Sequence, residues 1–155
     1  MSTPRCPHCR NFAFLDWQRC ERCEGEIGFH YRSQQFVAID DDGTEVDDER
    51  WFKCPHWGWG CNWLVREEAG SGQCFSCRLT RNKPDAGDTI AMEKLAETEV
   101  SKRRLVLQLL QLDLPIVGWR QRDGGLGFDL LSSRSSGERV TIGHANGIIT
   151  IDLAE

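Results

Sequence analysis

Alternating apolar and polar residues predict a β-hairpin in the first third of the chain. Its two strands are expected at residues 26–32 and 35–40, with the polar Ser33 and Gln34 forming the turn between them. The next segment, residues 40–49, contains seven acidic side chains and no basic one. We expect it to form a turn and then an exposed loop, because this composition favours solvated, irregular backbone.

The last third of the chain contains three further apolar stretches with the character of strands. They lie at residues 124–131, 139–142 and 147–153. The second and third are joined by a segment in which Asn146 and Gly147 form a strong hairpin-turn signal. This pattern predicts a short antiparallel β-sheet.

A helical pattern separates these two groups of strands. Apolar residues recur at roughly helical intervals, namely Ile90, Leu95, Val100, Leu105, Leu109 and Leu112. Asp88 or Thr89 can cap the first turn, and no glycine or proline follows before Pro115. We therefore expect one amphipathic helix, or two helices broken near residues 100 and 101. The preceding residues 82–87 include proline and glycine and are expected to be a linker.

The spacing of the cysteines indicates metal binding in the first half of the chain. All eight cysteines precede residue 78. They form four pairs, Cys6/Cys9, Cys20/Cys23, Cys54/Cys61 and Cys74/Cys77. A Cys-x-x-Cys turn lets two sulfur atoms converge on one ion, and two such turns complete the tetrahedron that Zn²⁺ accepts. We therefore predict two structural zinc ions, each held by four thiolates with no open coordination position.

A disulfide framework is the alternative interpretation of the same cysteines, and it requires an oxidising compartment. The N-terminal residues lack the apolar core of a secretion signal, and no stretch reaches the roughly 18 apolar residues of a membrane span. We therefore expect a cytoplasmic protein with reduced thiols. A redox protein that uses its Cys-x-x-Cys pairs is disfavoured, because two zinc sites leave no spare pair.

Two pairings of the cysteine turns are compatible with the spacing. In the sequential pairing the first two pairs share one ion and the last two share the other, whereas in the interleaved pairing the first pair joins the third. We favour the sequential pairing, because interleaving must close much longer loops. His8 and His56 lie in or beside the turns, and we assign them to the turns because eight sulfur atoms already fill two tetrahedra.

The charge of the chain bears on its partners. The formal net charge is -5, and zinc ligation by eight thiolates takes it to about -9. Such a chain has no overall attraction to nucleic acid, so that partner is unlikely and a protein partner is favoured. The segment of the first two cysteine pairs contains four arginines that could form a small basic surface, Arg5, Arg10, Arg19 and Arg22.

Aromatic residues gather around the third cysteine pair. Four of the six tryptophans lie there, Trp51, Trp57, Trp59 and Trp63. We expect them to form the miniature core of a zinc module rather than a contact surface, because a metal site alone buries little area. Together the patterns predict an α+β fold: two small zinc-ribbon or zinc-knuckle modules at residues 1–84, followed at 85–155 by an amphipathic helix and the short antiparallel sheet.

Several segments together resemble the N-terminal, zinc-ribbon-bearing region of the bacterial putative zinc-binding metallopeptidase family. They are Cys6-Pro-His-Cys9, Cys20-Glu-Arg-Cys23, Cys61-Asn-Trp-Leu-Val65, Cys74-Phe-Ser-Cys77-Arg-Leu-Thr-Arg81, Lys102-Arg-Arg-Leu105, Gly125-Leu-Gly-Phe-Asp129 and Gly143-His-Ala-Asn-Gly-Ile-Ile-Thr-Ile151. The resemblance implies that members continue beyond the equivalent of Glu155 into a His-Glu-x-x-His helix that holds a catalytic zinc.

The present sequence contains no such motif. Its histidines are His8, His30, His56 and His144, and none is followed by glutamate. We therefore hypothesise that residues 85–155 are the start of a truncated peptidase-like domain and that the chain alone is inactive, while its status as an enzyme is left open. The expected partner is the missing C-terminal domain. The alternative function is a free-standing zinc-ribbon adaptor that binds another protein.

Overall fold

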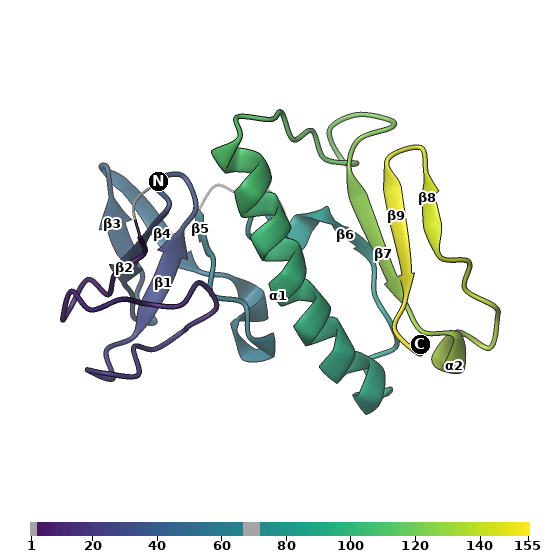
Figure 1. Cartoon of the computed structure of the whole chain (residues 1–155), viewed down its shortest axis with the longest axis horizontal. Coiled ribbons are helices and arrows are strands. Elements are labelled where there is room, and N and C mark those ends of the chain that lie inside the picture. The colour runs from purple at the N-terminus through teal and green to yellow at the C-terminus, as the bar shows by residue number, and fades with distance from the viewer. Residues whose placement is uncertain (1–2, 67–71) are drawn as a thin grey trace. The chain divides into compact units, whose positions relative to one another are not determined.

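The computed structural model of the chain describes residues 3–66 and 72–155 (Figure 1). The chain divides into two compact units, Met1–Phe75 and Ser76–Glu155. Among the described residues, the first unit holds five short strands, and the second holds four strands and the long helix. No helix in the described part of the chain is long and apolar enough to cross a membrane.

The first unit contains the hairpin that the sequence predicts. Strand β1 (Ile27–His30) pairs antiparallel with β2 (Gln35–Ala38), and Phe29 lies opposite Phe36. Strand β1 also contacts the segment around Cys61, because the Phe29 amide donates a 2.7 Å hydrogen bond to the Asn62 carbonyl. The hairpin therefore connects the residues around the two groups of cysteines.

The acidic segment is not the exposed loop that we expected. It contributes β3 (Thr44–Val46) and the start of β4 (Glu49–Lys53), which form an antiparallel sheet with β5 (Leu64–Arg66). Asp47 and Asp48 form the two-residue turn, with φ angles of 52° and 64°. This left-handed conformation suits a tight hairpin, and aspartate tolerates it better than most residues.

Basic side chains pair with two of the seven acidic residues of this segment, Asp41 and Glu49, and with Glu26. Lys53 forms ion pairs with Glu26 at 2.5 Å and Asp41 at 2.7 Å. Arg32 and Arg66 both reach the carboxylate of Glu49, at 3.2 and 2.8 Å. These pairs connect residues that are distant in sequence, so the local composition of the segment does not reveal them.

The tryptophans of the first unit divide between core and surface. Trp51 packs with Ile39 and Leu64 in a small buried cluster, and Trp63 is also buried. Trp57 packs against this cluster and is half-buried, whereas Trp59 remains 47% exposed. The expected aromatic core is thus present, but Trp59 is not part of it. Trp59 lies in the short 3₁₀ helix η1 (Pro55–Trp59).

The second unit confirms the predicted α+β class, but its sheet is mixed rather than antiparallel. The strand order is β6 (Thr80–Asn82), β7 (Gly127–Leu131), β9 (Ile148–Asp152) and β8 (Gly143–Ala145). Strands β6, β7 and β9 run parallel, and only β8 is antiparallel to its neighbour. The helix between β6 and β7 provides the crossover that parallel strands require.

The final hairpin is shorter than expected. Asn146 and Gly147 form its turn with φ angles of 49° and 84°, which confirms the predicted turn. Residues 139–142 are irregular, and the strand before the turn is instead Gly143–Ala145. The short helix α2 (Ser133–Ser136) occupies part of the connection from β7.

Helix α1 (Thr89–Gln111) is continuous, so the alternative of two broken helices is wrong. The Asp88 carboxylate caps its first turn by accepting a hydrogen bond from the Ala91 amide at 3.0 Å. Within the second unit the helix lies beside the sheet (Figure 1). Leu95, Val106 and Leu107 are among its buried side chains.

A buried charged network joins α1 to the sheet. The Lys102 ammonium group donates to the Thr80 hydroxyl at 2.5 Å and lies 2.6 Å from a carboxylate oxygen of Glu99. The Thr80 hydroxyl in turn donates to the other Glu99 oxygen at 2.6 Å. The Lys102 side chain is only 2% exposed and lies over the Phe128 ring. Removing one charge would therefore leave the other buried and unpaired.

We predict that Lys102→Met lowers the free energy of unfolding of the second unit by about 3 kcal/mol, because Glu99 loses its cation. The double variant Lys102→Met with Glu99→Gln should recover at least about 1 kcal/mol of that loss. Chemical denaturation followed by circular dichroism measures both values. Gln108→Met, at an exposed position of α1, is the control. Equal stability of the single variant and the wild type would contradict the prediction.

Candidate metal centres

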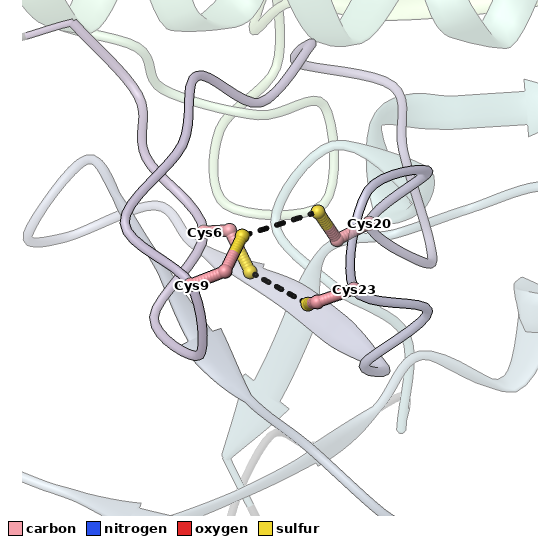
Figure 2. Close-up of side chains that lie close together, drawn as sticks. All are labelled: Cys6, Cys9, Cys20 and Cys23. Carbon is pink, nitrogen blue, oxygen red and sulfur yellow. Dashed lines mark hydrogen bonds between the residues drawn. The ribbon is translucent and has the colours of Figure 1, made fainter.

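The structure brings the cysteines together in two groups of four. One consists of Cys6, Cys9, Cys20 and Cys23, and the other of Cys54, Cys61, Cys74 and Cys77. Within each group the sulfur atoms all lie within 4.8 Å of one another. This grouping is the sequential pairing, and Figure 2 shows how the side chains of the first group converge.

The distances between sulfur atoms fit a tetrahedral metal site. The Cys6–Cys23, Cys9–Cys20 and Cys61–Cys74 pairs are each 3.7 Å apart. Four sulfur atoms at the usual Zn–S distance of about 2.3 Å form a tetrahedron with edges of about 3.8 Å. A disulfide would place them about 2.05 Å apart. The two groups are therefore suited to two zinc ions, as the cysteine spacing predicts.

The first group is built from two copies of one backbone turn, fourteen residues apart in the sequence. In each copy the amide of the first cysteine donates to the carbonyl five residues later, at 2.9 Å (Cys6 to Asn11 and Cys20 to Gly25). The residue after the second cysteine is left-handed in both, with φ of 67° at Arg10 and 62° at Glu24. The repeat places four sulfur atoms around one point.

An arginine closes each copy of the turn. Arg5 donates to the Arg10 carbonyl at 3.0 Å, and Arg19 donates to the Glu24 carbonyl at 2.6 Å. Both guanidinium groups thus have a structural contact beside the metal-binding turns. Two of the four arginines of the suggested basic surface, Arg5 and Arg19, therefore stabilise the cysteine turns.

The two histidines near the cysteines lie outside the sulfur groups. His8 Nε2 is 3.1 Å from the Glu26 carbonyl oxygen, and the His8 ring occupies the space that a Cβ on Gly25 would need. His8 therefore packs the first turn onto the second. His56 stacks on Trp59 with ring centroids 4.7 Å apart. Neither histidine is among the residues grouped as possible metal ligands.

Two amide side chains, the buried Asn62 and the half-buried Gln18, support the second group, and sequence analysis did not find them. Asn62 donates to the carbonyls of Leu15 and Trp17 at 2.7 and 2.9 Å. Gln18 donates to the carbonyls of Trp57 and Cys61 at 2.8 and 2.9 Å. These bonds fasten the loop between the first two cysteine pairs to the loop of the second group. No local sequence signal distinguishes these amides from ordinary surface residues.

The electrostatics of the first group call for a cation. The backbone amide and the side chain of Asn11 lower the pKa of Cys9 to about 6. The Gly25 amide also lowers the pKa of Cys23, but partial desolvation of its sulfur atom and the three neighbouring thiols outweigh it and raise that pKa to about 12. Four sulfur atoms this close cannot all ionise unless a positive ion lies among them. A zinc ion would supply that charge.

We predict that the purified chain contains two zinc ions and that both have sulfur ligands only. X-ray absorption should give four scatterers at about 2.3 Å and no nitrogen or oxygen shell. Cys20→Ser and Cys74→Ser should each lower the zinc content by one, whereas His56→Gln should leave it at two. A single zinc per chain, or a clear nitrogen contribution, would contradict this prediction.

The comparisons with known proteins agree with this geometry. Residues 4–88 match a family model described as a zinc-ribbon domain, and residues 91–155 match one described as putative zinc-binding metallo-peptidase. Uncharacterized proteins of Mycobacterium bovis and Mycobacterium tuberculosis are 40% identical over 151 residues, which cover 97% of this chain and 42% of each relative. No solved structure matches. The chain therefore belongs to the zinc-ribbon family and corresponds to the zinc-ribbon-bearing region of the putative zinc-binding metallopeptidase family.

Proposed function

We propose that this chain is the non-catalytic, zinc-ribbon-bearing part of a longer cytoplasmic metallopeptidase, and that its two zinc ions are structural. The observation that carries the proposal is the position of two complete Cys₄ groups directly before the residues that match the metallopeptidase family. A zinc ion with four sulfur ligands has no position for the water that peptide hydrolysis requires.

The remaining polar residues support a non-catalytic role. Within residues 3–66 and 72–155, the two cysteine groups are the only clusters of three or more histidine, cysteine or acidic side chains that could hold a metal. The sequence contains no His-Glu-x-x-His. His144 lies on the exposed strand β8, away from both groups in the sequence. The described residues thus offer neither a catalytic ligand set nor a general base beside one.

The sheet of the second unit supports the idea of a larger domain. All three residues of β8 are exposed, and four of the five residues of β9 are only half-buried. A hollow of about 490 Å³ is lined by residues of β6, β8 and β9, including Arg81, Ile148 and Thr150. Parallel strands, such as β6, β7 and β9, are usually found in sheets that are covered on both faces. The proposed partner is therefore the C-terminal part of the longer protein.

A free-standing adaptor is the second candidate, and one surface feature favours it. Phe12 and Phe14 are 48% and 56% exposed, and their rings meet edge to face at 5.2 Å. Trp17 continues the cluster, with its ring 5.2 Å from that of Phe14. Exposed aromatic side chains are common anchors in protein interfaces. The acidic net charge favours a protein over nucleic acid as the partner of this cluster.

We predict that the isolated chain, loaded with zinc, hydrolyses no casein at any pH, because neither zinc has an open position. A product extended through the downstream reading frame should hydrolyse casein if that frame encodes a His-Glu-x-x-His helix. The absence of such a helix downstream would favour the adaptor. Chelator-sensitive cleavage by the isolated chain that is lost in His144→Ala would contradict the proposed structural role of the metals.

A further inference from the structure

The two cysteine groups differ sharply in their exposure. In the second group Cys54, Cys61, Cys74 and Cys77 are all buried, with at most 2% of each residue exposed. In the first group Cys6 and Cys20 are fully buried, but Cys9 is partly exposed and Cys23 is exposed. Solvent therefore reaches one edge of the first group and is excluded from the second.

The exposed cysteine lies against a buried one. Cys23 Sγ is 3.7 Å from Cys6 Sγ, and the two side chains come from the two different copies of the repeated turn (Figure 2). Zinc ligation holds both sulfur atoms as thiolates, which are the nucleophilic form of cysteine. A small dissolved oxidant can reach such a thiolate at Cys23, whereas the protein shields the sulfur atoms of the second group.

We infer that Cys23 is a modification site for small two-electron oxidants such as hydrogen peroxide, and that its oxidation releases the first zinc while the second is kept. This inference rests on the proposed zinc binding. The Cys23 thiolate attacks one peroxide oxygen, the O–O bond breaks, and the leaving hydroxide takes a proton to become water. The product at Cys23 is a sulfenic acid.

The neighbouring cysteine completes the reaction. The Cys6 thiolate attacks the Cys23 sulfur, a disulfide forms, and the departing hydroxide takes a second proton to give water. Two electrons have then moved from the two sulfur atoms to one peroxide molecule. Only Cys9 and Cys20 remain as thiolates, and two sulfur ligands do not retain a structural zinc ion. A thiol reductant that cleaves the disulfide allows zinc to bind again.

The test uses the full 155-residue chain loaded with two zinc ions. Hydrogen peroxide is added while a chromophoric chelator reports released zinc and peptide mass spectrometry locates the oxidised cysteines. We expect one zinc to be released for each chain, together with a Cys6–Cys23 disulfide, and the second zinc to remain. Release of both zinc ions at one rate, or earlier oxidation at Cys54, Cys61, Cys74 or Cys77, would overturn the inference.

A ligand replacement isolates the role of Cys23. Histidine is a normal zinc ligand, so Cys23→His keeps a fourth donor but removes the exposed sulfur. Peroxide-driven release of the first zinc should be at least tenfold slower in this variant. Glu21→Gln, at an exposed position between Cys20 and Cys23 that is not among the grouped ligands, is the matched control, and it should leave that release unchanged. Equal release rates in Cys23→His and the wild type would overturn the inference.

Failure of the Cys23 inference and failure of zinc binding give different results. A chain that purifies with two zinc ions, both resistant to peroxide, would overturn the role of Cys23 and leave zinc binding intact. A chain that holds no zinc would overturn the zinc proposal itself. If Cys23→His fails to retain the first zinc, the order of oxidation in the wild-type peptides decides the question.

Discussion

The attraction between a divalent cation and four thiolates is the interaction on which the first unit depends. Its buried apolar side chains belong largely to the short strands of the hairpin and the sheet, such as Ile27, Phe29 and Trp51, and most of its cysteines are buried as well. Its strands have three to five residues each, and much of the remaining backbone is turns. A fold of this kind gains a large share of its stability from metal binding. The side-chain amides of Gln18 and Asn62 donate hydrogen bonds that connect the loop of the first cysteine group to that of the second. Ordering of one group therefore favours ordering of the other.

The second unit is organised differently. A parallel strand–helix–strand arrangement packs α1 against the sheet, and the buried Lys102 network joins the helix to β6 and β7. Apolar burial and a satisfied ion pair hold this unit together. The division resembles that of the two family models, which match a zinc-ribbon domain over residues 4–88 and a putative zinc-binding metallo-peptidase over residues 91–155.

Much of this arrangement could be predicted from the sequence where the signal is local. The cysteine spacing identifies both sulfur groups, Asp88 marks the start of α1, and Asn146 with Gly147 marks the last turn. The features that were missed depend on distant partners. Glu49 of the acidic hairpin is paired with two arginines, each 17 residues away in the sequence. The parallel pairing of β6 with β7 requires a crossover of more than forty residues. The role of Asn62 is likewise visible only in three dimensions.

Hydrogen exchange with and without a zinc chelator tests the dependence of the first unit on metal most directly. Amides of β1 and β4 should lose their protection when zinc is removed, because their small core cannot hold the fold alone. Amides in the middle of α1 should keep most of theirs, because the Lys102 network and the sheet remain. An equal loss of protection in β1, β4 and α1, or unchanged protection in β1 and β4, would contradict this account.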